Sequence, residues 1–454
     1  MKTTQRLVLL IAILASFVAF LDGSVVGVAL PAISRELGGG LVIQQWVNDA
    51  YLITLGTLIL TAGSFSDIFG RKKILVIGLI GFLVTSILCA VAVNGEMLII
   101  SRALQGVAGA LLVPSSLALI MSSFKGVTQA KAIGQWTSWT GIAFIIGPLV
   151  GGLMVDLLSW RLVFAINVIP IIISLVFLKR LDLEDTRTQK PIDMLGIVLG
   201  AIGLGGIVYA LIEQGRYGWN NILIWGTFVV GVAAMIGFML HERRTRHPML
   251  PLELFRIQNF SIGNLATLFI YAALALQGFL IVIFLQQVAG YPATLAGLVS
   301  LPITIIMFLL SSRFGALSGT YGPRVFMAVG PIIAGLGTIS MLLVTVPTLY
   351  WTQLLPGMIL FGLGLSITVA PLTSAILGAI QSSQAGIGSA INNAVARIAG
   401  LLSVAVIGLF IGTSITLNGF QTGIVLCSVL LILGGIVSAI GIQNLESKEP
   451  ASTL

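Results

Sequence analysis

Residues 63–73 read Gly63-Ser-Phe-Ser-Asp67-Ile-Phe-Gly70-Arg71-Lys72-Lys73 and lie between two apolar runs. Such a charged stretch is conspicuous in a chain of which only 8% of the residues are charged. Its glycines permit close helix approach and a tight turn. Asp67 adds a carboxylate, and Arg71 and Lys72 add cations, at the end of an apolar segment. An ordinary basic loop would account for the cations but not for the spacing of the two glycines about the acid.

The rest of the composition places this stretch in a membrane protein. The chain has 454 residues, of which 57% are hydrophobic, and its mean hydropathy is +1.10. A soluble domain would carry about 25% charged residues, so the lipid bilayer must be the solvent for most of the chain. Cys89 and Cys427 lie inside apolar runs, which favours packing roles and argues against a disulfide framework.

The apolar runs predict fourteen membrane-spanning helices, each of about 20 residues. The first run begins at Leu7 and continues to about Leu30 without a small-residue cleavage site, so we expect an uncleaved first span and not a signal peptide. The predicted spans are 7–30, 46–66, 74–94, 97–121, 132–155, 161–178, 194–213, 222–240, 260–286, 293–311, 325–346, 350–371, 386–411 and 421–442.

The distribution of basic residues supports this count. With both termini in the cytoplasm, 18 of the 23 Lys and Arg residues are cytoplasmic, Arg35, Arg161 and Arg216 are outside, and Arg102 and Arg397 lie within spans. Cytoplasmic loops of membrane proteins collect Lys and Arg. Removing one early span would invert every later loop and destroy this bias.

An internal repeat divides the chain into two halves. A shift of 252 residues places Gly63, Gly70 and Lys72 on Gly315, Gly322 and Arg324. The fold class is therefore an all-α integral membrane protein made of two six-helix bundles with two inserted helices. The predicted divisions are a first bundle over 1–180, the insert over 181–250, a second bundle over 251–445 and a cytoplasmic tail over 446–454.

Two ionisable residues are predicted to meet inside the membrane. Asp22 lies roughly 22 Å above the start of the first span, and Arg102 lies roughly 8 Å below the start of the fourth span on the other side, at 1.5 Å per helical residue. In a hydrocarbon core of about 30 Å these depths coincide. An ion pair, direct or through water, could bind and release a proton, or it could be a static pair that neutralises Arg102.

The fifth span carries a glycine and proline pattern, Gly141-Ile-Ala-Phe-Ile-Ile-Gly147-Pro148-Leu-Val-Gly151-Gly152. Pro148 removes a backbone donor and is expected to kink the helix. The glycines form a small-residue face for close helix contact. Generic helix packing would use such residues too.

These motifs resemble those of the major facilitator superfamily, and the resemblance covers essentially residues 1–445. The 63–73 stretch is similar to the loop between its second and third helices. Leu21-Asp-Gly-Ser-Val-Val-Gly-Val-Ala-Leu-Pro31 and Arg102-Ala-Leu-Gln-Gly106 resemble motifs of the drug:proton antiporters with fourteen helices. The 141–152 pattern resembles the motif of antiporters.

The resemblance implies a role for each motif. Asp22 would carry or gate a proton, and Arg102 would control its release. Gly63, Asp67, Gly70, Arg71 and Lys72 would form a gate, with Asp67 acting on the start of the thirteenth helix near Gly386. Gly141, Gly147, Pro148, Gly151 and Gly152 would shape an interface that opens and closes.

The second half gives weaker signals. Asn264, Gln277, Asn393, Arg397 and Glu213 are candidates for the substrate cavity. Glu213 ends the seventh span, where an interfacial role is the simpler explanation. Arg397 could contact a substrate anion or bond to backbone carbonyls.

The implied function is export of a small amphipathic molecule or drug in exchange for protons by alternating access. An uptake symporter or uniporter for a metabolite is the alternative, and a non-transporting membrane sensor is a remote one. We expect neither an enzyme nor a cofactor, since the sequence has no phosphate loop and no Cys/His metal spacing. The expected partners are the substrate, protons and lipid, with no nucleic acid and no ATP, for a monomer in the bacterial plasma membrane.

Overall fold

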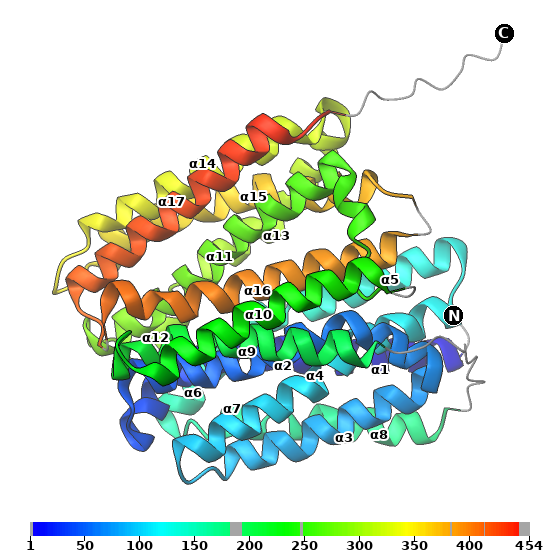
Figure 1. Cartoon of the computed structure of the whole chain (residues 1–454), viewed down its shortest axis with the longest axis horizontal. Helices are drawn as coiled ribbons and strands as arrows, with labels where there is room; N and C mark the ends of the chain where they lie inside the picture. Colours follow the sequence, from blue (N-terminus) through cyan, green and yellow to red (C-terminus); the bar gives the residue numbers. More distant parts are fainter. Residues whose placement is uncertain (1–2, 182–192, 246–247, 382–383, 413, 445–454) are drawn as a thin grey trace. The chain divides into compact units, whose positions relative to one another are not determined.

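The computed structural model describes residues 3–181, 193–245, 248–381, 384–412 and 414–444 of the chain, without the side chains of residues 3, 60, 63, 64, 67, 127 and 130. This described part is helical and contains no strand (Figure 1). Long helices of apolar residues form because the backbone hydrogen bonds are then satisfied within each segment, as a bilayer requires. The expected all-α membrane fold is confirmed.

Ten helices precede residue 251. They are α1 (Thr3–Leu37), α2 (Gly40–Phe69), α3 (Arg71–Ala90), α4 (Gly95–Ser123), α5 (Gly126–Gly141), α6 (Ala143–Leu157), α7 (Leu162–Ala165), α8 (Val168–Lys179), α9 (Met194–Tyr217) and α10 (Ile222–Arg244).

The remaining helices follow residue 251. They are η1 (Leu252–Arg256), α11 (Gln258–Gln287), α12 (Ala293–Leu298), α13 (Leu301–Tyr321), α14 (Pro323–Ser340), η2 (Met341–Leu343), η3 (Tyr350–Leu354), α15 (Leu355–Gly378), α16 (Ala385–Ile411) and α17 (Leu417–Gly441).

The helices account for the predicted spans. Within the described residues, 13 helical segments are long and apolar enough to cross a membrane. The expected span 46–66 lies in α2, a continuous helix of 30 residues, which is the fourteenth. Several spans consist of two consecutive helices, such as α5 and α6, which are separated only at Ile142.

The described chain forms two compact units. The first contains Met1–Pro251, Ala275–Leu301 and Gly400–Gly423, and the second contains Leu252–Leu274, Pro302–Ala399 and Ile424–Leu454. Both α11 and α16 therefore contribute to each unit. The divisions expected at 180, 250 and 445 stay predictions.

The internal repeat has a structural counterpart in two helix junctions. Gly70 separates α2 from α3 with φ 100° and ψ 133°, and Gly322 separates α13 from α14 with φ 83° and ψ 154°. Residues with a side chain rarely adopt such positive φ values. This explains why the glycine is retained in both copies although the neighbouring charges differ.

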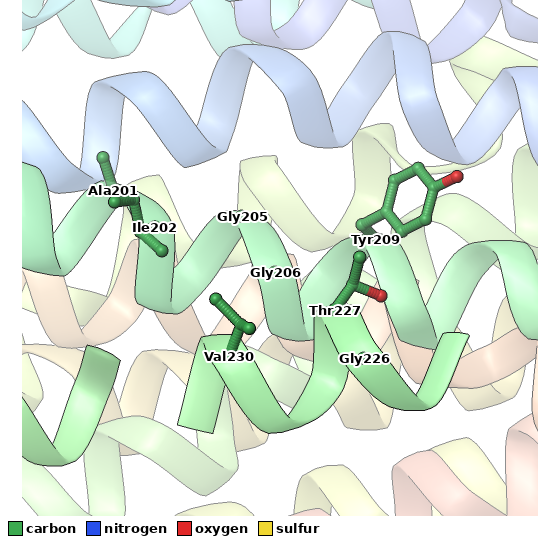
Figure 2. A pocket seen from close by; sticks show the side chains of 8 residues that line it. All are labelled: Ala201, Ile202, Gly205, Gly206, Tyr209, Gly226, Thr227 and Val230. Carbon is green, nitrogen blue, oxygen red and sulfur yellow. The ribbon is translucent and has the colours of Figure 1, made fainter. Parts of the chain in front are cut away.

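The two inserted helices, α9 and α10, lie side by side (Figure 1). Their backbones approach closely, because a Cβ atom on Gly206 would lie 2.8 Å from the Thr227 carbonyl oxygen. A shallow apolar groove of about 410 Å³ runs between them, lined by Ala201, Ile202, Gly205, Gly206, Tyr209, Gly226, Thr227 and Val230 (Figure 2). None of the sequence-predicted site residues lines this groove.

Candidate functional site

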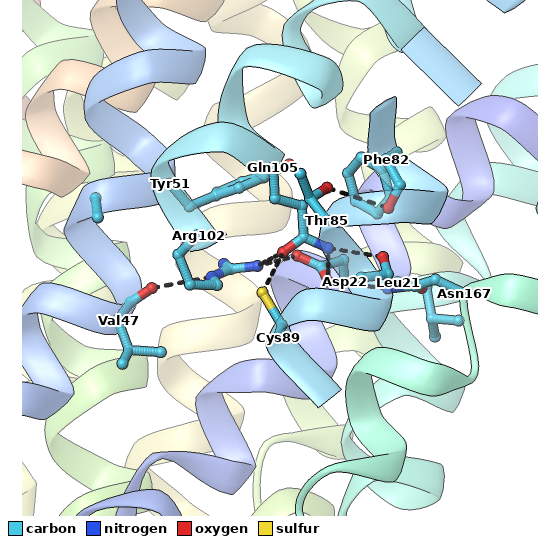
Figure 3. A network of polar contacts seen from close by, with 12 residues as sticks. Leu21, Asp22, Val47, Tyr51, Phe82, Thr85, Cys89, Arg102, Gln105 and Asn167 are labelled. Atoms are coloured by element: carbon cyan, nitrogen blue, oxygen red, sulfur yellow. Dashed lines mark hydrogen bonds and ion pairs between the residues drawn. The ribbon is translucent and has the colours of Figure 1, made fainter. Parts of the chain in front are cut away.

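The predicted pair of Asp22 and Arg102 is in direct contact. Asp22 lies on α1 and Arg102 on α4, with side chains 0% and 2% exposed. Arg102 Nη1 donates to Asp22 Oδ2 over 2.6 Å (Figure 3). Because an unpaired buried charge is strongly destabilising, the stability of this pair depends on its hydrogen-bond partners.

The carboxylate of Asp22 is surrounded by hydrogen-bond donors. Gln105 Nε2 and Asn167 Nδ2 donate to Asp22 Oδ1 over 3.1 and 3.0 Å, while Arg102 occupies Oδ2. Gln105 Nε2 is also 2.9 Å from Ser86 Oγ on α3. Both oxygens of the carboxyl group are therefore engaged by hydrogen-bond donors.

Arg102 is held by more than its ion pair. Its Nε donates to the Val47 carbonyl oxygen on α2 over 3.0 Å, and its Nη1 donates to Gln105 Oε1 over 2.7 Å. The guanidinium carbon lies 4.3 Å from the centre of the Tyr51 ring, a favourable cation–π distance. The site thus joins α1, α2, α3 and α4 with Asn167, the N-cap residue of α8 (Figure 3).

A glycine permits this assembly. A Cβ atom on Gly106 would lie 2.3 Å from the Tyr51 carbonyl oxygen, so α2 and α4 approach each other closely only because this position has no side chain. The close approach brings Arg102 within reach of the α2 backbone.

The structure adds residues that the sequence analysis did not single out. Gln105 shares a helix face with Arg102 at spacing i, i+3, which could have identified it. Asn167 is a lone amide in an otherwise apolar span, but its distance of 145 positions from Asp22 conceals their contact.

Asp49 is a second buried acid that the sequence analysis missed. It lies on α2 and is 0% exposed. Asn48 donates to its Oδ1 over 2.8 Å, whereas Oδ2 has no hydrogen-bond partner among the described atoms. Gln45, one turn earlier on the same face, donates to the Val404 carbonyl oxygen of α16 over 2.6 Å. An acid in the tenth position of a mostly apolar helix was the available signal.

The antiporter-like pattern packs against two different helices. A Cβ atom on Gly147 would lie 2.0 Å from Ser24 Oγ on α1, and one on Gly152 would lie 2.4 Å from the Thr294 Cα atom on α12. Gly151 would meet the Val25 carbonyl oxygen at 3.2 Å, whereas Gly141 has nothing within 4 Å. The helix interruption lies at Ile142, six positions before Pro148, and the interface role stays a prediction.

The gate residues are described only in part. Gly63 lies within α2, Gly70 ends it, and Lys72 Nζ donates to the Leu181 carbonyl oxygen. The side chain of Asp67 lies outside the described residues. α16 begins at Ala385, close to the expected start near Gly386, but the predicted action of Asp67 on it stays a prediction.

The remaining candidates are divided between the two units, with Glu213 and Gln277 in the first and Asn264, Asn393 and Arg397 in the second. Glu213 accepts a 2.7 Å hydrogen bond from Trp46 Nε1, which joins α9 to α2. Asn264 on α11 accepts from Asn392 of α16 at 3.3 Å. Gln277 is buried, and Asn393 and Arg397 are half-buried on α16. Their role in a substrate cavity stays a prediction.

The fold and the buried polar network define a multi-pass membrane transporter. Residues 12–404 match the family model of the Major Facilitator Superfamily. The chain belongs to this superfamily, and it is accordingly a transporter and not an enzyme.

Relatives of known name are similar over most of their length. The chain is 31% identical over 416 residues to the methylenomycin A resistance protein of Bacillus subtilis, covering 91% of this chain and 89% of that protein. It is 33% identical over 425 residues to the multidrug resistance protein Stp of Mycobacterium tuberculosis, with 90% and 76% covered. It is 31% identical over 414 residues to the probable actinorhodin transporter of Streptomyces coelicolor, with 88% and 71% covered.

Solved structures support the fold. A crystal structure of the peptide transporter POT in complex with sulfate aligns with a TM-score of 0.71 over 95% of this chain and 93% of that one, at 16% sequence identity. A POT family transporter in complex with 5-aminolevulinic acid aligns with a TM-score of 0.70 at 13% identity, covering 95% of this chain and 94% of that one. At these identities the similarity shows the fold alone.

Proposed function

We propose that the protein exports a small amphipathic drug or antibiotic in exchange for protons. The names of its relatives, a methylenomycin A resistance protein and a multidrug resistance protein, support export of such molecules. The observation that carries proton coupling is the position of Asp22, a fully buried carboxylate with donors on both oxygens. Ionisable groups inside membrane spans typically serve ion or proton pathways.

Protonation of Asp22 would be linked to helix movement. A proton on Oδ2 would turn this acceptor into a donor that faces the Arg102 guanidinium, which can only donate. The pair would separate, and α1 would lose its strongest polar contact with α4. A proton could therefore favour one arrangement of the helices and its loss the other, as alternating access requires.

The setting of the transporter is part of the proposal. It would act as a monomer in the bacterial plasma membrane, with both termini in the cytoplasm, driven by the proton gradient without ATP or a bound cofactor. The gate at residues 63–73 would stabilise one state, with Asp67 on the start of α16. The half-buried Arg397 would contact the substrate or the helix backbone.

The test is substrate-induced proton movement in inverted vesicles that contain the protein. Lipophilic cations, neutral drugs and anionic metabolites are added in turn to vesicles with an imposed pH gradient, which a pH-sensitive dye reports. We expect one class to collapse the gradient for the wild type and not for Asp22→Asn. Asp49→Asn is the matched control, since it also replaces a fully buried carboxylate.

Each other outcome has a definite meaning. Undiminished antiport by Asp22→Asn at normal protein levels would remove Asp22 from the coupling mechanism, and loss only in Asp49→Asn would transfer the role to Asp49. If no class moves protons through correctly folded protein, the uptake symporter or uniporter becomes the better explanation, and direct ligand binding would decide between them.

A further inference from the structure

A cluster of titratable side chains lies away from the candidate site, where α9 begins and α10 ends. Asp193 is the N-cap residue of α9, and its Oδ1 accepts from the Gly196 backbone amide over 2.9 Å. His241 Nε2 on α10 lies 2.8 Å from the same oxygen. Through this one oxygen, Asp193 connects the start of α9 to the end of α10.

Glu242, the next residue on α10, also uses one carboxyl oxygen to accept a backbone hydrogen bond. It is only 3% exposed, and its Oε2 accepts from the Leu250 backbone amide over 2.9 Å. Leu250 lies in the segment that leads from α10 to η1. Glu242 therefore ties this connecting segment back to the end of α10.

The other oxygen of each carboxyl group borders the same small space beside Gly196. Asp193 Oδ2 and Glu242 Oε1 have no hydrogen-bond partner among the described atoms when both acids are taken as ionised. They lie 2.7 and 3.0 Å from one common point, the position that a Cβ atom on Gly196 would occupy. Glycine at position 196 leaves the room in which they meet.

Two facing, buried carboxylates repel each other, and such a pair is stable when one proton is shared between them. We infer that Asp193 and Glu242 form a proton-binding site that holds one proton between Asp193 Oδ2 and Glu242 Oε1. The bound proton lets both carboxyl groups keep their other contacts, to Gly196, His241 and Leu250. We call these residues the insert clasp.

Among the described residues around the clasp, His241 is the titratable group that bonds to it. On α10, His241 contacts Asp193, and Arg243 and Arg244 are exposed. On α9, the titratable residues Tyr209, Glu213, Arg216 and Tyr217 lie at the far end of the helix. On α2, which also packs against α9, Asp49 contacts Asn48 and Tyr51 contacts Arg102; the side chain of Asp67 is not described. In η1, Glu253 and Arg256 are both exposed.

The sign of the pH dependence follows from the shared proton. The closed clasp binds one more proton than the open clasp does, so a falling pH favours closure and a rising pH favours opening. An alkaline cytoplasm would therefore release Leu250 and loosen the segment between the insert and η1.

The test is hydrogen exchange of the segment that contains Leu250, measured by mass spectrometry on the full-length protein in detergent between about pH 6 and about pH 9. Rates are corrected for the intrinsic pH dependence of exchange. Between the pKa of the open clasp and the higher pKa of the closed clasp, we expect protection of this segment in the wild type to fall by about tenfold per pH unit, and to level off above that range.

Glu242→Gln is the informative variant, because its amide can donate permanently to Asp193 Oδ2 and its oxygen can accept from Leu250. We expect its protection to be high and nearly independent of pH. Asp193→Asn provides the same replacement from the other side if Glu242→Gln does not fold. Glu253→Gln, an exposed acid in η1, is the matched control and should retain the wild-type response.

Three results would overturn the inference. They are wild-type protection that does not change with pH, an unchanged pH response in both Glu242→Gln and Asp193→Asn, and protection at high pH that is restored by sodium, potassium or calcium ions. The last result would indicate a bound metal ion in place of the proton. None of these readouts depends on transport, so the clasp and the proposed antiport can fail independently.

Discussion

Single residues show how a buried charge is made tolerable in this membrane protein. Asp22 and Arg102 each have partners for several of their polar atoms, and these partners come from α1, α2 and α4 and from Asn167. Removal of one charge would leave the other buried without compensation, which is more harmful than removal of both.

A double-variant comparison tests this point. Arg102→Gln should destabilise the protein by about 3–5 kcal/mol, because the Asp22 carboxylate would remain buried without its cation. The double variant Asp22→Asn with Arg102→Gln should lose less stability than Arg102→Gln alone. Thermal unfolding in detergent checks both, and a double variant that is less stable than Arg102→Gln would refute the argument.

Asp49 should behave in the opposite way. Its Oδ2 has no partner among the described atoms, so Asp49→Asn removes a buried group that is costly when ionised. We expect equal or higher thermal stability, most clearly at alkaline pH, while Asp22→Asn lowers it. A clear loss of stability in Asp49→Asn would mean that the acid has a partner that is important for the fold.

The sequence located part of this site for a physical reason. Depth along straight helices follows from counting residues, which was enough to bring Asp22 and Arg102 to one level. Counting residues along a helix could not identify the partner Asn167, because this contact depends on how α7 and α8 pack against α1. Asp49 was not predicted as a buried site residue, because an acid this close to the predicted start of a span is expected at the polar interface.

At the scale of helices, close packing is set by glycine positions that look alike in the sequence. Gly152 faces the backbone of α12, whereas Gly141 faces open space. We expect Gly152→Ala to destabilise the protein by about 1–3 kcal/mol, since the backbone must move to admit a methyl group. Gly141→Ala, from the same motif, should have little effect on thermal unfolding. Equal effects of the two substitutions would argue against the α6–α12 contact.

A carboxylate strengthens the same helix contact. Asp156 near the end of α6 accepts from the Ala293 and Thr294 backbone amides of α12, over 2.9 and 2.7 Å, and from Thr294 Oγ1 over 2.6 Å. Asp156→Ala should cost about 0.5–2 kcal/mol, as loss of a helix cap does. Thr294→Val should cost less, because both backbone donors remain paired. If Asp156→Ala is neutral in thermal unfolding, the contact is not stabilising.

Helix limits were predictable only to the extent that hydrophobicity reports them. The runs 7–30 and 46–66 identified α1 and α2, but these helices extend over Thr3–Leu37 and Gly40–Phe69. The apolar pattern marks the hydrocarbon region, while helical hydrogen bonds continue beyond it. Interruptions such as Ile142 were invisible, because a one-residue turn does not change the hydropathy of a span.

For the whole molecule, the number of spans was the strongest prediction, because it rests on two independent physical signals. Apolar runs give the spans, and the placement of Lys and Arg gives their order across the membrane. The structure supports the first signal through its long apolar helices. The second signal, the placement of Lys and Arg, concerns the two sides of the membrane, so the orientation is tested by a separate experiment.

Cysteine labelling of intact cells provides that experiment. Asn220, between α9 and α10, is expected outside, and Lys125, between α4 and α5, is expected in the cytoplasm; both are exposed. A membrane-impermeant maleimide should therefore label Asn220→Cys in intact cells and Lys125→Cys only after permeabilisation. The native cysteines, Cys89 and Cys427, are buried and should give little background. Labelling of both positions from outside would contradict the fourteen-span orientation, because the three predicted spans between them place Lys125 and Asn220 on opposite sides of the membrane.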